Sequence, residues 1–366
     1  MKVLHLLAGS NIGGIETLCR DYTSYSIHEN VMVILWDNGP LGEEMVRMGV
    51  KVICLYASKK NVFSVVHRVA VVCQNEKADA VIAHHASPMS HLCLLYLKKR
   101  NRHIRTFAYA HEDASDMIRE SKRQGLWLRK MIIKTSLNHA DQVVAISKFV
   151  KGSLIDCFGT PENKIAVVYN GVDLSRFNLP AKPSTDGTLR MIYVGRLIPG
   201  KGVQVILETL TCLRLRGKFH LRIVGDGPYR NELERFVQEH ELTGNVEFLG
   251  NRRDVPELLS ESDVFIHMPL CEEGFGIAIV EAMAAGLLCV CLAKGGIPEI
   301  ISSGKDGILV ESSAELKRVL NTIISKDENN KIKLIRQNAV DKAGDFSIKK
   351  YAAGLDQVIN SKRQTQ

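Results

Sequence analysis

Two glutamates in a strongly apolar stretch are the side chains of this sequence best placed to do chemistry. Glu273 and Glu281 lie in EEGFGIAIVEAMAAG, residues 272–286, where nearly every other residue is glycine or apolar. A helix this apolar should be buried, and a buried carboxylate without partners costs several kcal/mol. Each glutamate therefore needs a ligand or hydrogen-bonding partners, although a core helix with one glutamate paired to an arginine remains an alternative.

The glycines of this stretch define how the two carboxylates are presented. Gly274 and Gly276 permit an unusual turn, and a helix is expected from there to a left-handed cap at Gly286. Glu273 would precede that helix and Glu281 would lie about one turn inside it, so they would contact different parts of one elongated ligand. Backbone amides that could hold an anion between them are those of Phe275, Gly276 and Ile277.

A pair of cations lies in YVGRLIPGKG, residues 193–202. Arg196 and Lys201 flank a Pro199-Gly200 turn, so both could converge on one anion, the arginine as a fork and the lysine as a point charge. Two solvated loop cations are the alternative.

Glycine turns follow several other predicted strands. Gly13 and Gly14 in GSNIGGIETL open a helix near Ile15, without the G-x-G-x-x-G spacing of a nicotinamide site, although a purely structural turn is also possible. Gly225 in IVGDGPYR could line a base or ribose. Arg252, in the similar loop FLGNRRD, could also be simply solvated.

The elements that must position these residues alternate between short β-branched runs and longer helical patterns. This alternation, with nearly continuous apolar strands, predicts a parallel sheet covered on both faces. The first half has seven such runs: 3–8, 31–36, 52–56, 80–84, 106–110, 143–146 and 165–169. The second half repeats the pattern from LRMIYVG to GILV. The predicted fold class is α/β, with two doubly wound, Rossmann-like parallel-sheet domains facing a cleft.

Domain boundaries follow from NLPAKPSTDGT, residues 178–188, which breaks the alternation with two prolines and small polar residues. We predict an N-terminal domain over 1–178, a second domain over 179–347, and a C-terminal helix over 348–366 that packs back on the first domain. Open parallel sheets bind ligands at the carboxyl ends of their strands, and the glycine and charged motifs fall in such turns.

Net charge is +8, and residues 98–134 contribute strongly, with 11 basic and 4 acidic side chains. Apolar residues interleave with these cations, among them Met117, Leu126, Trp127, Leu128, Met131 and Ile132. The stretch could lie on an anionic bilayer, or it could be a solvated helix face over a core stripe. Nucleic acid is not expected, because no helix-turn-helix, finger or aromatic platform accompanies the charge.

Nine cysteines are spaced for neither zinc nor a disulfide scaffold, so reduced, buried thiols are expected. No run approaches 18 apolar residues, and the first residues do not form a convincing signal peptide. The expected location is cytoplasmic, with the inner face of a membrane as a refinement.

Taken together, these motifs resemble the retaining glycosyltransferases of family 4, which have the GT-B architecture. The residues that carry the resemblance are Gly13, Gly14 and Glu16 in GGIETL, His111 in YAHED, NGVDLSRF at 170–177, Gly195, Arg196 and Lys201 in GRLIPGKG, and the E-x7-E pair Glu273 and Glu281. The likeness spans nearly the whole chain. It implies transfer of a sugar from a nucleoside-diphosphate sugar to a glycan or lipid-linked acceptor, as in bacterial surface polysaccharide synthesis.

The resemblance also implies residue roles. The expected catalytic residues are Glu273, His111, Arg196 and Lys201. The donor is expected to bind Gly14, Gly195, Arg196, Lys201, Gly225, Arg252, Glu273, Gly274, Phe275, Gly276, Ile277 and Glu281, and the acceptor Gly13, Glu16 and His111. Within these sets, the two cations would bind the diphosphate, Glu281 the ribose and Glu273 the sugar hydroxyls.

No cofactor and no metal are expected, because the chain has no Asp-x-Asp pair and the cations with the helix amides would replace a divalent ion. In the family, retention is ascribed to front-face attack without a protein nucleophile. His84, His85 and His91 could suggest a metal site, but they are better explained as lining an acceptor site or capping a strand. Two alternatives remain: a nucleotide-sugar epimerase of the same architecture, and a non-catalytic sugar-nucleotide-binding protein.

Overall fold

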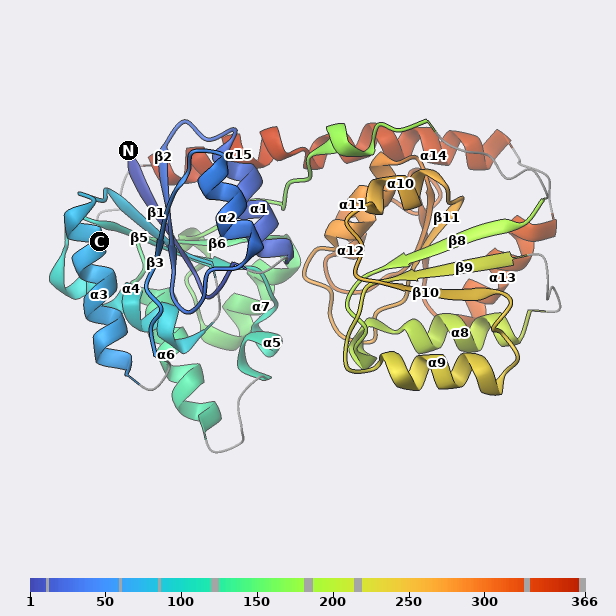
Figure 1. The fold of residues 1–366 in the computed structure, drawn as a ribbon, viewed down its shortest axis with the longest axis horizontal. Coiled ribbons are helices and arrows are strands. Elements are labelled where there is room, and N and C mark those ends of the chain that lie inside the picture. Colours follow the sequence, from blue (N-terminus) through green and yellow to red (C-terminus); the bar gives the residue numbers. More distant parts are fainter. Residues whose placement is uncertain are drawn as a thin grey trace. The chain divides into compact units, whose positions relative to one another are not determined.

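The protein is represented by a computed structural model that describes residues 1–10, 13–58, 61–84, 87–119, 125–180, 187–213, 219–325 and 330–361. Over these residues the chain divides into two compact units. The first unit contains residues 1–171 and helix α15 (Ile348–Asn360), and the second contains residues 172–347. Figure 1 labels many of the elements of both.

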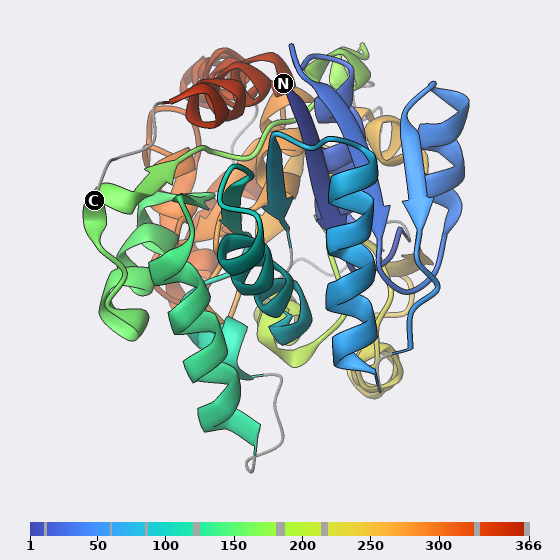
Figure 2. The same cartoon turned by 90° about the vertical axis from the view of Figure 1, so that its left-hand side faces the viewer.

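The first unit is built on a seven-stranded parallel sheet with the order β3-β2-β1-β4-β5-β6-β7 (Figures 1 and 2). Its strands are β1 (Lys2–Leu7), β2 (Glu29–Ile34), β3 (Lys51–Cys54), β4 (Ala80–Ala83), β5 (Arg105–Ala110), β6 (Gln142–Ala145) and β7 (Ile165–Val167). Its helices besides α15 are α1 (Gly14–Thr23), α2 (Pro40–Arg47), α3 (Val62–Asn75), α4 (Pro88–Arg100), α5 (Ala114–Arg119), α6 (Leu126–His139) and α7 (Lys148–Phe158), with a short 3-10 helix η2 (Glu162–Lys164).

The second unit contains a six-stranded parallel sheet with the order β10-β9-β8-β11-β12-β13. The strands are β8 (Leu189–Val194), β9 (Phe219–Val224), β10 (Val246–Gly250), β11 (Val264–His267), β12 (Leu288–Leu292) and β13 (Ile308–Val310). The helices are α8 (Val203–Thr211), α9 (Arg230–Glu239), α10 (Val255–Ser260), α11 (Ile277–Ala284), α12 (Ile297–Ile300), α13 (Ser313–Ser325) and α14 (Asn330–Ala343), with 3-10 helices η3 (Leu174–Phe177), η4 (Pro199–Lys201) and η5 (Gly344–Phe346).

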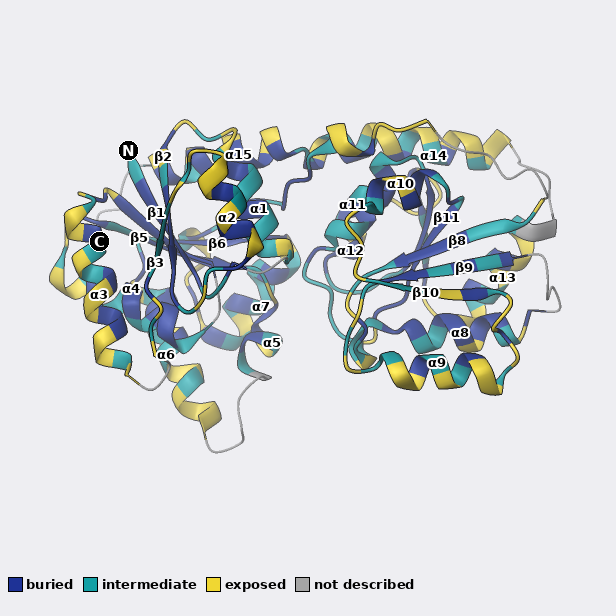
Figure 3. Ribbon diagram, viewed as in Figure 1, coloured by how far each residue is buried: buried dark blue, intermediate teal, exposed yellow. Residues whose placement is uncertain are grey.

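The central strands are buried on both faces, as the apolar runs predicted. All four residues of β4 and of β11 are buried, as are five of the six in β1 and in β5. Because successive side chains of a strand point to opposite faces, such strands must be covered from both sides by helices. Figure 3 shows the buried strands between helices whose outer sides are exposed. The predicted fold class of two doubly wound α/β domains is confirmed.

The second unit begins at Val172, earlier than the predicted boundary at residue 179. The amide of Val172 donates to the carbonyl of Phe346 over 2.9 Å, and η3 packs against α10 and α11. Residues 172–178 therefore belong to the second unit, because their backbone pairs with its last segment. Within the expected linker at 178–188, residues 181–186 lie outside the described part of the chain.

Helix α15 belongs to the first unit, where it packs against α1. The buried carboxylate of Asp356 on α15 accepts hydrogen bonds from Tyr22 Oη (2.5 Å), Ser26 Oγ (2.9 Å) and the amide of Ile27 (2.9 Å). A buried carboxylate is tolerated only when such donors replace water. This carboxylate therefore holds α15 against α1 and against the segment that joins α1 to β2.

Both sheets reverse their strand order at one point, between β1 and β4 in the first unit and between β8 and β11 in the second. In open parallel sheets, ligands bind at the carboxyl ends of the strands beside such a switch point. The loops after β1, β4, β8 and β11 are therefore where a site should be sought.

Candidate active site

The loops that follow β8 and β11 are locked together at the switch point of the second unit. The carbonyl of Gly200 accepts hydrogen bonds from the amides of Leu270 (2.8 Å) and Cys271 (2.9 Å). Gly202 has φ +70°, and a Cβ there would lie 1.7 Å from the carbonyl oxygen of Met268. Only glycine allows this approach. The backbone thus places the end of η4 directly beside the loop that carries the first motif glutamate.

Lys201, Glu273 and His267 form a compact cluster at this point. Lys201 Nζ lies 2.6 Å from Glu273 Oε2, and His267 Nε2 donates to the same oxygen over 3.0 Å. Their side chains are 22%, 13% and 6% exposed, in the order Lys201, Glu273, His267. Burial opposes ionisation of Glu273, but the His267 hydrogen bond and the charge of Lys201 outweigh it and lower its pKa to about 2. Glu273 is therefore a carboxylate at neutral pH.

The backbone of Glu273 is held as firmly as its side chain. Its carbonyl accepts a 2.7 Å hydrogen bond from the amide of Gly296. Gly295 has φ +59°, and a Cβ there would lie 2.3 Å from that carbonyl oxygen. The loop before α12 therefore fixes where the Glu273 carboxylate can point.

His267 and the neighbouring Tyr193 were not singled out in the sequence. His267 ends β11, and the buried ring of Tyr193 on β8 stacks on it with ring centroids 6.0 Å apart. The available signal was a single histidine at the carboxyl end of an otherwise apolar strand, VFIH. Nothing in the sequence marks Tyr193, because tyrosine is common in buried strands.

Helix α11 begins at Ile277 after Gly276 (φ +103°), and Gly286 follows it at φ +75°, which confirms the predicted start and left-handed cap. Its N-cap residue, Gly276, has no side chain that could cap the helix, and backbone amides at a helix N-terminus favour an anion. The predicted contribution of Phe275 is restricted to its backbone, because its ring is 1% exposed and packs edge-on against Phe346 at 5.4 Å.

Glu281 and Gly274 are both half-buried. Glu281 is the fifth residue of α11, and Gly274 immediately follows Glu273 in the preceding loop. The two motif glutamates thus lie on the same short helix and its entry loop, as the E-x7-E spacing predicted.

The other residues expected to bind the donor lie at the ends of β8, β9 and β10. Arg196 is exposed, and it makes no ion pair with any residue that the structure describes. Gly225 has φ +126°, and a Cβ there would lie 2.0 Å from the carbonyl oxygen of Gly195, so packing alone requires glycine. Arg252 is exposed and forms a bidentate pair with Asp254 at 2.7 and 2.5 Å.

The glycine turn of the first unit opens α1, close to the predicted position. Gly13 is its N-cap and Gly14 its first residue, while residues 11 and 12 lie outside the described ranges. The Glu16 carboxylate folds back over this turn, where a Cβ on Gly13 would lie 2.5 Å from Glu16 Oε2. Burial raises the pKa of Glu16. This end of α1 therefore presents a partly desolvated carboxyl group.

His111 follows β5 and terminates a row of three histidines. His84 Nδ1 lies 3.2 Å from His111 Nε2, and His84 Nε2 lies 2.9 Å from His5 Nδ1. The ring of Tyr109 stacks on His111 with centroids 4.2 Å apart and an interplanar angle of 9°. His5 and His84 are fully buried and His111 is half-buried. His111 is thus held by a second switch-point cluster, of which the sequence analysis had singled out only His84 and His111.

Among the described residues, one group of side chains could hold a metal ion. His5, Cys19 and His84 offer ligand atoms within 4.8 Å of one another, and all three are buried. His91 lies on α4 as a buried residue outside this group, and burial lowers its pKa to about 4. His85 lies outside the described ranges. The nitrogens of His5 and His84 already pair with each other and with neighbours.

The basic stretch 98–134 is not one continuous surface, because it includes the buried strand β5. Lys98 pairs with Asp141 at 2.5 Å, and Met117 is buried. The exposed apolar side chains gather at the start of α6: Leu126, Trp127, Leu128 and Met131. Residues 120–124 and the Arg119 side chain lie outside the described part. No described helix is long and apolar enough to cross a membrane.

All nine cysteines are unpaired, but only five of them are buried, so the expectation of buried thiols holds only in part. The exceptions are Cys54, Cys157, Cys212 and Cys271, of which Cys212 is exposed.

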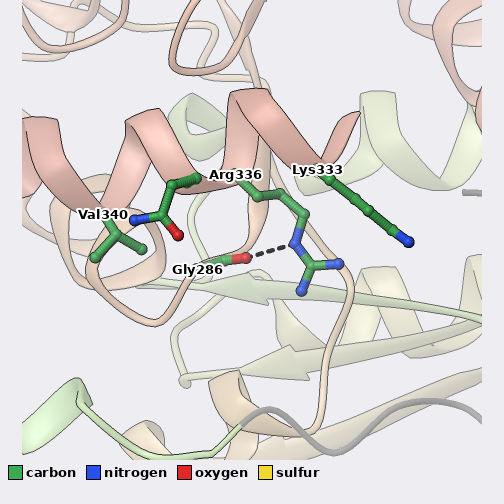
Figure 4. Close-up of a pocket in the computed structure, with 5 residues that line it drawn as sticks. Gly286, Lys333, Arg336 and Val340 are labelled. Carbon is green, nitrogen blue, oxygen red and sulfur yellow. Dashed lines mark hydrogen bonds between the residues drawn. The ribbon is translucent and has the colours of Figure 1, made fainter. Parts of the chain in front are cut away.

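A pocket of about 300 Å³ lies away from these clusters, between α14 and the end of α11 (Figure 4). It is lined by Gly286, Lys333, Arg336, Gln337 and Val340. Arg336 Nε donates to the carbonyl of Gly286 over 2.6 Å, which satisfies a carbonyl at the end of α11. No residue predicted for the active site lines this pocket, and we interpret the Arg336 contact as a helix cap.

Comparison with protein families gives two adjoining matches. Residues 12–176 match the model for Glycosyltransferase Family 4, and residues 176–340 match that for Glycosyl transferases group 1. A putative colanic acid biosynthesis glycosyltransferase, WcaL of Salmonella typhimurium, is 32% identical over 232 residues, which are 60% of this chain and 57% of that protein. An uncharacterized glycosyltransferase of Methanocaldococcus jannaschii is 25% identical over 78% of this chain and 76% of that protein.

Solved structures share the same architecture. Anabaena Alr3699/HepE, in complex with UDP and glucose, has a TM-score of 0.84 and 23% identity, over 99% of this chain and 100% of that one. The Rickettsia africae glycosyltransferase has a TM-score of 0.79 and 20% identity, over 98% and 99% of the two chains. At such identities the likeness establishes the fold. With the two adjoining family matches, it places this chain in family 4 of the glycosyltransferases, with the GT-B architecture.

Proposed function

We propose that this chain moves a sugar from a nucleoside-diphosphate sugar to a hydroxyl group of a glycan or lipid-linked acceptor. The observation that carries the proposal is the cluster of Lys201, Glu273 and His267 at the switch point of the second unit, beside the N-terminus of α11. A largely buried carboxylate, a cation and the amides at the start of a helix together suit a ligand that has both hydroxyls and phosphates. The complex of Anabaena Alr3699/HepE with UDP and glucose supports the same ligand class.

The diphosphate is assigned to the cations and the helix. Breaking the bond between the sugar and the diphosphate leaves negative charge on a phosphate oxygen, so positive groups contribute most as that charge develops. Lys201 is already oriented by Glu273, and the exposed Arg196 is the second cation of the same loop. With the amides of Phe275, Gly276 and Ile277, these groups replace the divalent ion that Asp-x-Asp transferases use.

The sugar and the ribose are assigned to the two glutamates. Glu273, ionised and held by Lys201, accepts hydrogen bonds from hydroxyls of the transferred sugar, and Glu281 binds the ribose. No side chain is assigned as a nucleophile. The acceptor oxygen attacks the anomeric carbon from the face that the diphosphate leaves, the bond to the diphosphate breaks, and the acceptor proton passes to the departing phosphate oxygen. The anomeric configuration is then retained.

Ligand binding is the first test. UDP-glucose and UDP should each raise the thermal unfolding midpoint, because a ligand that binds only the folded form stabilises it. Transfer is then measured with a panel of hydroxylated acceptors, with and without EDTA. Undiminished turnover in EDTA supports metal-free transfer, and its loss contradicts it. Release of free UDP with an epimerised sugar, in the absence of acceptor, would instead support the epimerase.

Stereochemistry is tested separately on the product. If transfer from an α-linked donor gives an α-linked product by NMR, retention is supported. A β-linked product would show inversion and would remove the front-face mechanism while leaving the transferase assignment intact.

We further propose that the acceptor is lipid-linked and that the start of α6 contacts an anionic membrane at its inner face. Exposed Trp127, Leu128 and Met131 lie beside Lys130 and Lys134, and the helix has no acidic residue. Apolar side chains that enter the interface and cations that meet anionic headgroups suit such a surface.

The membrane proposal is tested by sedimentation with vesicles that contain anionic lipid. The double variant Trp127→Ser, Lys130→Ser should bind these vesicles several-fold more weakly than the wild type. Phe63→Ser is the matched control, because Phe63 on α3 is also an exposed apolar residue, at 89% exposure, but lies outside the basic stretch 98–134. Equal binding by the wild type and the double variant would contradict the proposal.

A further inference from the structure

The row of histidines in the first unit contains a feature that the proposed function does not use. The row begins at Asn30 on β2, passes through His5 on β1 and His84 after β4, and ends at His111 after β5. Its three hydrogen bonds are 2.9, 2.9 and 3.2 Å long. Because a neutral imidazole has one donor and one acceptor nitrogen, the protonation of each ring depends on that of its neighbour.

The direction of the row is set at Asn30. Its Nδ2 donates to the backbone carbonyl of His28 over 3.0 Å, and its Oδ1 lies 2.9 Å from His5 Nε2. A carbonyl only accepts, so the amide cannot be turned around without setting two oxygens against each other. His5 must therefore carry its proton on Nε2 and donate it to Asn30.

The remaining rings follow from this choice. His5 Nδ1 is then an acceptor, so His84 must donate to it from Nε2. His84 Nδ1 is in turn an acceptor, so His111 must donate to it from Nε2. We propose that Asn30, His5 and His84 are positioning residues that fix His111 in the Nε2–H tautomer, with the lone pair on Nδ1.

The surroundings of the row favour neutral rings, which this relay requires. His5 and His84 are 0% and 1% exposed, and burial lowers the pKa of His5 to about 4. The Tyr109 ring stacks on both His84 and His111, at 5.2 and 4.2 Å between centroids, which restrains their rotation. A metal ion bound by His5, Cys19 and His84 would have to break the hydrogen bond between the two rings.

The consequence for chemistry concerns what His111 can recognise, and it rests on the proposed function. A neutral His111 with its lone pair on Nδ1 accepts a hydrogen bond at that atom, so the group it meets must be a donor. A sugar hydroxyl satisfies this requirement, whereas a carboxylate or phosphate oxygen does not. The row thus makes His111 selective for hydroxyl-bearing ligands although three of its four members touch no ligand.

The tautomers can be observed without any activity assay. The probe is the full chain labelled with ¹⁵N-histidine, in long-range ¹H–¹⁵N spectra at neutral pH, with signals assigned by single His→Gln variants. We expect His5, His84 and His111 all to be neutral with the proton on Nε2. An Nδ1–H tautomer at His111, or one equivalent of zinc held by the isolated protein, would overturn the inference.

The relay is tested by Asn30→Leu, which removes the oxygen that orients it. His111 should then show a mixture of tautomers, and kcat should fall by about two- to threefold, because only part of the population keeps the lone pair on Nδ1. Val31→Ala is the control, because Val31 is a fully buried neighbour on β2 and its truncation lowers stability without touching the row. An unchanged His111 signal in Asn30→Leu contradicts the relay.

These outcomes are distinguishable from failure of the proposed function. A protein with the expected tautomers that transfers no sugar keeps the relay and refutes the transferase. An active transferase with the other tautomer at His111 does the reverse. If Asn30→Leu does not fold, the wild-type spectrum alone decides the first point.

Discussion

The two switch points have the same strand order, but one carries a row of neutral rings and the other carries a pair of opposite charges. In the first unit, loops after β4 and β5 bring together rings that are held by hydrogen bonds in a row, two of them fully buried. In the second unit, loops after β8 and β11 bring together a lysine and a carboxylate 2.6 Å apart, with a histidine on the same oxygen. The same type of sheet thus carries neutral hydrogen-bonding groups at one switch point and paired charges at the other.

The difference matches two kinds of recognition. Charges act strongly on a phosphate group but tolerate many orientations, while hydrogen bonds between neutral groups depend on direction and on which atom donates. In our proposal the second unit binds the diphosphate together with the ribose and the sugar, and His111 of the first unit adds a directional contact to a hydroxyl group. The two clusters should therefore respond differently to substitution and to salt.

The largest effect is expected at the charged cluster. Lys201→Ala should lower kcat by about 10²–10³, the usual cost of removing one group that stabilises developing negative charge. Steady-state kinetics with a nucleotide sugar and an acceptor measures this.

Two further variants test whether the charge of Lys201 is responsible for this loss. Lys201→Arg, which keeps the charge, should recover part of the rate, and Lys305→Ala, an exposed cation elsewhere in the second unit, should not alter it. A Lys201→Ala enzyme within threefold of the wild type would show that the pair with Glu273 is only structural.

The pH dependence of stability should carry the signature of Glu273. Its pKa falls from 4.5 to about 2 on folding, so the folded state binds this proton more weakly than the unfolded state. The stabilisation is complete above about pH 4.5 and is lost as the pH falls towards 2, a difference of roughly 3 kcal/mol. Glu273→Gln should lack this part of the pH profile, measured by denaturant unfolding. Parallel profiles for the two proteins would refute the assignment.

The contact between α15 and the rest of the first unit should contribute to stability and not to binding of a charged ligand. Asp356→Ala leaves the buried Tyr22 hydroxyl and two partly exposed donors without their acceptor and should lower the free energy of unfolding by roughly 2–4 kcal/mol. Gln357→Ala, at the exposed neighbouring position, should change it little. Thermal or denaturant unfolding provides the measurement. An effect of equal size in both variants would mean that helix propensity, not the buried carboxylate, is responsible.

The smallest effect should come from the neutral cluster. His111→Ala should lower kcat about tenfold, the value of one hydrogen bond to a neutral hydroxyl. This loss should be the same at low and high salt, because no charge is removed, whereas donor binding by the Lys201 cluster should weaken with salt. Salt-dependent kinetics of His111→Ala would contradict the division between the two units.

Much of the fold could be predicted because its strands are short, β-branched and buried on both faces. The runs at 3–8 and 80–84 became β1 and β4, and the glycines around Ile277 marked both ends of α11. These features are local, since each depends on neighbouring residues. The boundary at residue 179 was misplaced because the pairing of Val172 with Phe346 joins residues far apart in the chain.

Residues of the candidate site could be singled out where their motifs are local, and they were missed where the register of the strands brings them together. Glu273 and Lys201 stood out by type and spacing, but their partner His267 was read only as part of a strand. The histidine row joins residues that are 25, 79 and 27 positions apart, and only the parallel register of β2, β1, β4 and β5 brings them together. The sequence could not show that the stretch 98–134 is divided, because the burial of β5 between its two basic parts depends on the sheet.

The anchoring of α15 by Asp356 also bears on how the protein is made. The first unit needs this helix to complete its surface, yet the ribosome delivers it only after every residue of the second unit. The second unit is one uninterrupted stretch of chain, so it can fold before synthesis ends. Until α15 is made, the hydrogen-bond donors of Tyr22, Ser26 and Ile27 lack the Asp356 carboxylate as their acceptor. The helix that completes the first unit is therefore the last of the described elements to be synthesised.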